Sequence, residues 1–403
     1  MYSYEEVLEK IESGRRFGNL PGVEITRIML EKLNHPQREL SFIHVAGTNG
    51  KGSVCAFLDS IMREAGLKTG CFISPHLVDF RERITVKGQM ISKGDVVRLG
   101  NRLLSENFGV NPTMFDYCLA MAVLYFREQQ CDVAIIETGL GGRLDSTNAL
   151  GMPEVSVITR IGYDHMAILG NTLHEIAGEK AGILKPGVPA VFAPQEPEAL
   201  EVLNQHADGI CVTEKDMLKA EAMKPALIGD YQRENAAAAM LAAEIYLNKI
   251  HASAIGESVK KGIHHAKWQG RMDILSTDPF FMVDGAHNSN GIHALKRSLM
   301  KLYPGEKFHF IMGVMADKDY ENMVEELLPL AIDFVTVTPD STRALQGSAL
   351  ADFIERKGVP AQALQRISDI WKGVKHGEKT IALGSLYFIG ELIEQFQKGQ
   401  HVV

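Results

Sequence analysis

The chain contains the segment Gly47-Thr48-Asn49-Gly50-Lys51-Gly52-Ser53, which joins an apolar run, Ser41 to Ala46, to an apolar-periodic run, Val54 to Ala65. This order predicts a strand, a glycine-rich turn and a helix. Glycines let backbone N–H groups approach a polyphosphate, the helix N-terminus carries partial positive charge, and Lys51 can reach the terminal phosphates. The segment therefore predicts a site for a nucleoside triphosphate.

The segment departs from the general phosphate-loop pattern at two positions. That pattern expects glycine where Val45 stands, and serine or threonine directly after the lysine, where Gly52 stands. The alternative interpretation is a glycine turn that carries a solvated lysine.

Short β-branched and apolar runs alternate with longer amphipathic stretches on both sides of this segment, which predicts parallel sheets covered by helices. The first series of expected strands comprises Phe42 to Ala46, Thr69 to Ile73, Val133 to Ile136, Val155 to Ile161 and Ala190 to Ala193. The second series comprises Phe280 to Asp284, Phe308 to Val314, Phe334 to Thr338 and Thr380 to Leu383. The second series predicts a smaller doubly wound domain.

Two features lie between the two series of strands. Tyr231 to Asn248 has the pattern of an alanine-rich buried helix, and Trp268-Gln269-Gly270-Arg271 reads as a connection. We therefore expect an α/β protein with an ATP-binding domain over residues 1–269 and a C-terminal domain over residues 270–403.

Composition narrows the classes of function. The 403 residues, 45% of them hydrophobic, are too many for one ordinary core, and 42 basic against 50 acidic residues give no electrostatic footprint for nucleic acid or an anionic membrane. The longest apolar stretch, Ala236 to Leu247, is interrupted by Glu244, so no membrane span is expected. Five scattered cysteines without a C-x-x-C pair predict neither disulfides nor a zinc site, and they favour a reducing cytoplasm. Small molecules are the expected partners.

Two further segments follow expected strands and carry polar side chains. Glu137 ends a buried strand and opens into a glycine-rich run, where a carboxylate beside a phosphate loop could hold Mg²⁺; a solvated acid is the alternative. His165, in Gly162-Tyr163-Asp164-His165, could complete a second metal position, although a lone histidine is more often structural. By composition alone, Glu179 to Ile183 is an ordinary exposed helical turn.

Taken in order, these motifs resemble the folylpolyglutamate synthase and bifunctional dihydrofolate synthase family, within the Mur-ligase superfamily of ATP-dependent amide-forming ligases. The resemblance rests on G-T-N-G-K-G-S from Gly47, S-P-H-L from Ser74, E-T-G-L-G-G-R-L-D from Glu137, D-H at Asp164, E-K-A-G-I from Glu179, G-R at Gly270, D-G-A-H-N from Asp284 and G-S-L-Y from Gly384. It covers nearly the whole chain. It implies an N-terminal Mur-ligase-type domain with a mostly parallel sheet and a smaller Rossmann-like C-terminal domain.

The resemblance also implies roles for individual residues around Mg-ATP. It matches Ser74, Glu137 and His165 to magnesium ligands. It matches Asn235, Arg271 and Asp284 to nucleotide contacts, and the triphosphate cradle to Asn49, Gly50, Lys51, Gly52 and Ser53. Lys180 matches a lysine that CO₂ carbamylates in this family. An ammonium would repel Mg²⁺, whereas a carbamate offers it anionic oxygen.

On the substrate side, His287 and Ser385 match positions near the incoming glutamate, and Asp145 matches one associated with a pteroate pocket. The alternatives are a loop histidine and a helix N-cap serine. Phe80 could stack on a pterin or pack in the core. The residues that the resemblance implies for catalysis are Lys51, Lys180, His165 and His287.

The implied reaction is phosphoryl transfer followed by acyl transfer. A carboxylate of a folate, or of dihydropteroate in a bifunctional enzyme, attacks the γ-phosphate of ATP, and the amino group of L-glutamate then displaces phosphate from the acyl phosphate. A monomer is the family expectation. The alternatives are a Mur-type ligase acting on a cell-wall nucleotide and a non-catalytic nucleotide switch.

Overall fold

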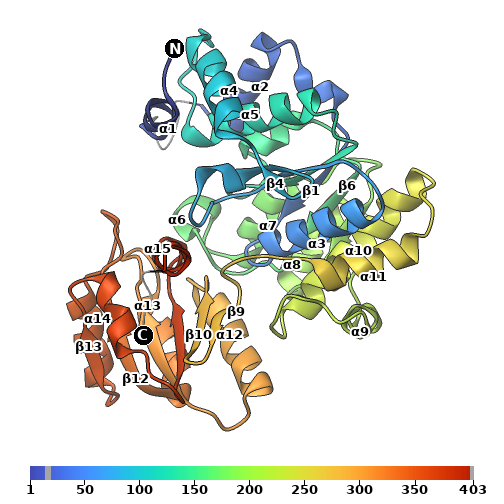
Figure 1. The fold of residues 1–403 in the computed structure, drawn as a ribbon. Helices are drawn as coiled ribbons and strands as arrows, with labels where there is room; N and C mark the ends of the chain where they lie inside the picture. The colour runs from blue at the N-terminus through green and yellow to red at the C-terminus, as the bar shows by residue number, and fades with distance from the viewer. Residues whose placement is uncertain (14–19, 400–403) are drawn as a thin grey trace. The chain divides into compact units, whose positions relative to one another are not determined.

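The structure is a computed structural model, and it describes residues 1–13 and 20–399. The chain forms two compact units (Figure 1). The first comprises Met1–Ala226 and Gln232–Lys267, and the second comprises Leu227–Tyr231 and Trp268–Val403. The chain therefore passes between the units three times, and the short segment Leu227–Tyr231 belongs to the second unit although residues of the first unit flank it.

The first unit is built on one sheet of eight strands in the order β4-β3-β2-β5-β1-β6-β7-β8. The strands are β1 (Phe42–Ala46), β2 (Thr69–Phe72), β3 (Ile84–Val86), β4 (Gln89–Met90), β5 (Val133–Glu137), β6 (Val155–Ile158), β7 (Ala190–Phe192) and β8 (Ile210–Cys211). All neighbours from β2 to β8 pair in parallel, whereas β3 and β4 add an antiparallel edge. In the register, His44 of β1 lies between Ile136 of β5 and Ser156 of β6.

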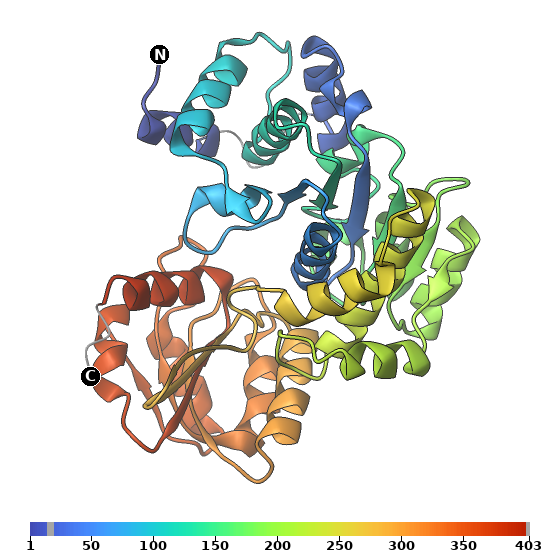
Figure 2. The same cartoon turned by 45° about the vertical axis from the view of Figure 1, so that its right-hand side comes forward.

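Helices lie on both faces of this sheet (Figures 1 and 2). They are α1 (Tyr4–Glu12), α2 (Gly22–Lys32), α3 (Lys51–Glu64), α4 (Lys93–Ser105), α5 (Met114–Glu128), α6 (Met166–Leu169), α7 (Leu173–Ala181), α8 (Pro197–His206), α9 (Glu214–Ala222), α10 (Gln232–Lys249) and α11 (Ile255–His265). Helices α3, α10 and α11 pack on one another, and Gly262 of α11 lies so close to Ile61 of α3 that a side chain there would overlap it. Apolar residues of α1, α2, α4 and α5 form one core with the sheet, and those of α7 and α8 form another.

The second unit has one sheet of six strands in the order β13-β12-β11-β14-β10-β9. Its strands are β9 (Asp273–Thr277), β10 (Phe280–Asp284), β11 (Phe308–Met312), β12 (Ala331–Thr336), β13 (Ala361–Ala363) and β14 (Lys379–Leu383), and its helices are α12 (Ser289–Leu302), α13 (Tyr320–Leu327), α14 (Gly347–Arg356) and α15 (Leu386–Gln397). Only β9 is antiparallel to its neighbour. Side chains of α12, α13 and α14 share a core with β11, while Phe281 of β10 contacts Trp371.

Short 3-10 helices complete the two units: η1 (Pro36–Glu39), η2 (Phe80–Arg83), η3 (Ser146–Leu150), η4 (Leu328–Leu330) and η5 (Ile367–Gly373). The predicted α/β class with mostly parallel sheets is confirmed. None of the helices in the described part of the chain combines the length and the apolar character that crossing a bilayer requires.

Some strands end earlier than their apolar patterns predict. The run Val155 to Ile161 pairs only as far as Ile158, opposite Ala46 of β1. Beyond that point β1 continues into the glycine segment. The backbone oxygen of Arg160 accepts hydrogen bonds from the N–H groups of Thr48 and Asn49, which belong to this loop and not to a strand. The strand ends because its neighbour becomes a loop.

Candidate active site

The segment Gly47 to Ser53 forms the loop between β1 and the first turn of α3. Gly47 and Gly50 have φ of +150° and +89°, in the region that side-chain-bearing residues rarely adopt. A Cβ at Gly47 would overlap Oγ1 of Thr159, and one at Gly50 would overlap the side chain of Asn235. Only glycine satisfies both the backbone angles and the close neighbours. The predicted strand, turn and helix are therefore all present.

Two lysines converge on one carbonyl of this loop. Lys180 Nζ lies 2.8 Å from the oxygen of Gly47, and Lys51 Nζ lies 3.3 Å from the same oxygen and 3.3 Å from that of Thr48. Lys180 is only 3% exposed, so the interpretation of its segment as an exposed helical turn is wrong. Burial, followed by the nearby charge of Lys51, lowers the pKa of Lys180 to about 7.

The burial of Lys180 comes from the way α7 meets the glycine-rich run after β5. Thr172 is the N-cap of helix α7 and forms a capping box with Glu175, and Lys180 lies in the last turn of the helix. Arg143 donates its backbone N–H to the oxygen of Glu179 at 2.7 Å, and a Cβ at Gly142 would lie 2.9 Å from the oxygens of Glu179 and Lys180. Because these contacts join segments some 40 positions apart, periodicity within α7 could not reveal them.

Two of the three predicted magnesium ligands, Ser74 and Glu137, lie side by side. Glu137 ends β5, is buried, and accepts a hydrogen bond of 3.0 Å from the backbone N–H of Ser74, which follows the neighbouring strand β2. The side chain of His165 is 46% exposed, and its Nε2 lies 3.9 Å from Asp164. Carboxylate and hydroxyl oxygens are donors that Mg²⁺ prefers, so Glu137 and Ser74 fit the ion by chemistry. No cluster of three or more His, Cys, Asp or Glu suited to a metal occurs among the described residues.

The start of α10 supplies a site residue that sequence reasoning missed. Buried Gln232 donates its side-chain amide to Ser53 Oγ at 3.2 Å and accepts a hydrogen bond of 3.0 Å from Asn235. The predicted cradle residue Ser53 and the predicted nucleotide contact Asn235 are therefore joined through one side chain. Its only sequence signal was a glutamine at the start of the alanine-rich helix.

Asp145 is buried, and its carboxylate is engaged by its own loop. Oδ2 accepts from the N–H of Leu140 at 2.8 Å, and Oδ1 accepts from the N–H of Thr147 at 3.0 Å and from its hydroxyl at 2.5 Å. Thr147 also lies 2.8 Å from Nε2 of the buried His44 in β1, a contact that the sequence did not suggest. Burial raises the pKa of Asp145. Phe80 packs in the apolar core of the first unit.

The remaining predicted residues gather at the carboxyl edge of the second sheet. Asp284 ends β10 opposite Leu383 of the adjacent β14, so the D-G-A-H-N and G-S-L-Y segments leave the sheet side by side, joined by a hydrogen bond of 3.0 Å from Gly384 N–H to the oxygen of Ala286. His287 Nδ1 lies 2.8 Å from the oxygen of Gly285. Ser385 occupies the N-cap position of α15, but its side chain makes no capping hydrogen bond.

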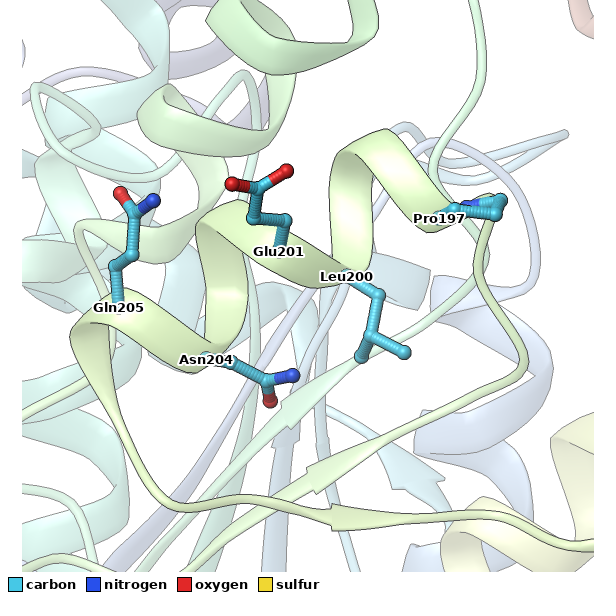
Figure 3. Close-up of a pocket in the computed structure, with 5 residues that line it drawn as sticks. All are labelled: Pro197, Leu200, Glu201, Asn204 and Gln205. Carbon is cyan, nitrogen blue, oxygen red and sulfur yellow. The ribbon is translucent and has the colours of Figure 1, made fainter.

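A hollow elsewhere in the first unit does not include these residues. It has a volume of about 570 Å³ and is lined by Pro197, Leu200, Glu201, Asn204 and Gln205 (Figure 3). All five side chains come from α8. The hollow contains no predicted site residue and no glycine-rich loop, so it is not the candidate active site.

Models of two Mur-ligase domains match the chain. The model described as "Mur ligase middle domain" matches residues 45–193, and "Mur ligase, glutamate ligase domain" matches residues 270–382. The dihydrofolate synthase/folylpolyglutamate synthase of Bacillus subtilis is 36% identical, over 97% of this chain and 98% of that protein. The chain belongs to the folylpolyglutamate synthase/dihydrofolate synthase family.

Other members of the folylpolyglutamate synthase family agree with this assignment. The folylpolyglutamate synthase of Lacticaseibacillus casei is 31% identical over 85% of this chain and 87% of that protein. The structure of Mycobacterium tuberculosis folylpolyglutamate synthase complexed with ADP and AMPPCP matches with a TM-score of 0.86 and 27% identity over 98% of both chains. Neither the cell-wall ligase nor the nucleotide switch is favoured by these comparisons.

Proposed function

We propose that this chain is an ATP-dependent ligase that joins L-glutamate to the carboxylate of a folate. The observation that carries the proposal is the glycine loop with two lysines on the Gly47 carbonyl, in a chain whose two matched regions are both Mur-ligase domains. We extend the proposal to dihydropteroate as a second acceptor, because the Bacillus subtilis relative carries both activities in its name.

The reaction proceeds in two balanced steps. A carboxylate oxygen of the folate attacks the γ-phosphorus, the bond to the bridging oxygen breaks, and ADP leaves. The amino nitrogen of glutamate then attacks the acyl carbon, loses a proton, and phosphate leaves. Most of the catalytic effect in such transfers is positioning and charge stabilisation, which requires no covalent enzyme nucleophile.

The first unit supplies the groups for the phosphates. Loop N–H groups from Asn49 to Ser53 would line the triphosphate, and Lys51 would leave the carbonyls of Gly47 and Thr48 for phosphate oxygens. Mg²⁺, when bound with ATP, neutralises charge on the phosphate oxygens. Ser74, Glu137 and His165 are the proposed ligands, and Asn235 is a proposed nucleotide contact.

Lys180 is a proposed site of carbamylation. Its pKa of about 7 leaves a large neutral fraction near neutral pH, and the neutral amine is the form that attacks CO₂. The neutral nitrogen forms a bond to the carbon of CO₂, one carbon–oxygen π bond opens, and the nitrogen loses one proton, so a buried neutral amine becomes a buried anionic carbamate. A carbamate there would offer anionic oxygen to Mg²⁺.

The second unit supplies the remaining proposed contacts. Arg271 and Asp284 are assigned to the nucleotide, and His287 and Ser385 to the incoming glutamate, while Asp145 of the first unit is assigned to the pteroate side. We propose a domain division at residues 1–269 and 270–403 and a monomeric protein that acts on small molecules in the cytoplasm. The five free thiols agree with a reducing compartment.

The test is ADP release by the purified chain with Mg-ATP and L-glutamate, comparing tetrahydrofolate, dihydropteroate and a muramyl nucleotide. We expect release that requires glutamate together with a pteroyl compound, and the compound used identifies the acceptor. Release only with the muramyl nucleotide would contradict the proposal. ATP binding without release in any mixture would contradict it as well.

A further inference from the structure

Both chain segments that lead into the second unit meet at a single carboxylate. One segment is Leu227–Tyr231, and the other begins at Trp268 and continues into β9. Asp284 accepts a hydrogen bond of 3.2 Å from the hydroxyl of Tyr231 in the first segment and one of 2.8 Å from the N–H of Met272 in the second, both on Oδ2. Its Oδ1 accepts from the N–H of Ala286 at 2.8 Å.

Asp284 is therefore engaged on both oxygens, and it is only 3% exposed. A buried carboxylate is stable when hydrogen-bond donors surround it, and these donors come from three separate segments. Burial raises the pKa of Asp284, and the charge of Arg271 opposes that shift. The carboxylate acts as the common point at which the three segments are joined.

The two segments also interlock by shape. Gly229 has φ of +120°, and a Cβ there would lie 2.9 Å from Cε1 of Tyr231 and 3.0 Å from Sδ of Met272. Met272 itself has φ of +43°, an unfavourable conformation for a residue with a side chain, and that side chain is buried in the core of the second unit. Backbone strain of this kind persists only where surrounding contacts hold it, and it concentrates at functional sites. We call Gly229, Tyr231, Met272 and Asp284 the connector clamp.

The connector clamp fixes the backbone around Arg271. On one side of Arg271, the oxygen of Gly270 accepts the N–H of Gly285 at 2.8 Å; on the other, the N–H of Met272 is held by Asp284. A Cβ at Gly285 would overlap the guanidinium of Arg271, so the Arg271 side chain runs directly over the peptide bond between Asp284 and Gly285. The hydroxyl of Tyr231 bonds to Asp284, the same acid that accepts the N–H of Met272.

We propose that Tyr231 is a positioning residue for the ligase reaction: its hydroxyl holds Asp284, and Asp284 in turn sets the backbone that presents Arg271 to the nucleotide. The inference rests on the proposed function, because the role of Arg271 toward ATP is part of that proposal. The next residue, Gln232, holds Ser53 of the phosphate-loop helix. One peptide bond therefore joins the connector clamp to the phosphate cradle.

The first test is Tyr231→Phe, which keeps the ring against Gly229 and removes only the hydroxyl. The matched control is Tyr303→Phe, since Tyr303 packs by its ring against Phe280 and Phe308 in the same unit. Because a hydrogen bond to a charged group is lost, we expect the KM for Mg-ATP to rise about tenfold in Tyr231→Phe and to stay within about twofold in Tyr303→Phe. The thermal midpoint of Tyr231→Phe should lie no more than a few degrees below that of Tyr303→Phe, because one buried hydrogen bond is lost and the packing is kept. An unchanged KM in Tyr231→Phe, or equal changes in both variants, would overturn the inference.

A second measurement asks whether Tyr231 acts through Arg271. Arg271→Ala should raise the KM for Mg-ATP by itself, and adding Tyr231→Phe should then raise it no further. Independent, multiplying effects of the two substitutions would overturn the proposed route.

A third measurement does not depend on turnover. Hydrogen exchange at the Met272 amide should quicken in Tyr231→Phe and not in Tyr303→Phe. Equal exchange in both variants would mean that the hydroxyl of Tyr231 does not help to hold this amide. If the wild type ligates no glutamate, the proposed function fails, and the exchange result still decides whether the connector clamp exists.

Discussion

The loop at Gly47 in the first unit and the edge at Asp284 in the second both follow a parallel strand, yet opposite charges organise them. At the loop, the amino groups of two lysines rest on one backbone carbonyl, and one of them belongs to a helix far along the chain. At the edge, one carboxylate gathers backbone N–H groups and a hydroxyl from three segments. Under the proposed function, Lys51 exchanges its carbonyl contacts for phosphate oxygens, whereas Asp284 keeps its protein donors while it contacts the nucleotide.

This difference explains why the two regions should respond differently to substitution. The groups around Gly47 are positioned by a rigid backbone turn with no room for a side chain. The groups around Asp284 are positioned by hydrogen bonds to a buried acid, and the neighbouring glycine faces the far ends of the Arg271 and Leu386 side chains. Damage to the loop should therefore remove chemistry or stability outright, and damage to the edge should be graded.

The largest expected effect is that of Lys51→Ala. Loss of the ammonium that stabilises charge on the transferring phosphoryl group should lower kcat/KM by at least about 10²- to 10³-fold, with the fold intact. Steady-state ADP release and thermal unfolding measure the two quantities. Lys219→Ala, which removes a surface lysine paired with Glu244, is the control and should leave the rate unchanged. Near-normal turnover in Lys51→Ala would contradict the assignment of the loop.

Adding one methyl group to each region tests the contrast between the loop at Gly47 and the edge at Asp284. Gly47→Ala places a Cβ against the short side chain of Thr159 at a φ of +150°, and should lower the free energy of unfolding by about 3 kcal/mol. Gly285→Ala displaces the ends of two long side chains, Arg271 and Leu386, and we expect a loss of about 1 kcal/mol or less.

Urea denaturation of the two variants tests this order. Gly256→Ala, in α11 with nothing within 4 Å of the new methyl group, is the control and should be neutral or stabilising. If Gly285→Ala proves the more damaging of the two variants, the contrast between rigid loop and adaptable edge is wrong.

The last effect concerns pH and tests the polar core behind the loop. Burial, with a smaller contribution from Lys185, lowers the pKa of His44 to about 3 from an ordinary value of 6.5. Between these values the unfolded chain binds a proton that the folded chain does not, so acid favours unfolding. From pH 8 to pH 5 this residue should remove about 2 kcal/mol of stability.

His44→Gln keeps an amide that can donate to Thr147 and does not titrate. The difference in unfolding free energy between wild type and His44→Gln should therefore shift in favour of the variant as the pH falls from 8 to 5. Urea titrations at both values measure the shift. Parallel pH dependence in the two proteins would mean that His44 is not held neutral.

Much of the fold followed from local pattern. The apolar runs Phe42 to Ala46 and Phe280 to Asp284 became β1 and β10 with their predicted limits. The glycine segment was placed correctly between strand and helix. Strands β3, β4, β8, β9 and β13, at the margins of the two sheets, were not predicted. Four of them are only two or three residues long and have little pattern of their own, and β9 lies in the connection that follows Trp268.

The candidate site divides in the same way. Local sequence was sufficient to predict the α/β class and the segments assigned to the proposed chemistry, because strand alternation, glycine turns and ordered motifs are properties of neighbouring residues. Three contacts required the tertiary structure. Lys180 is buried against Gly47, and Gln232 joins Ser53 to Asn235. Tyr231 belongs to the second unit and bonds to Asp284. Burial and hydrogen bonding are set by residues distant in the chain, and a local pattern carries no record of which distant segment will come to lie beside it.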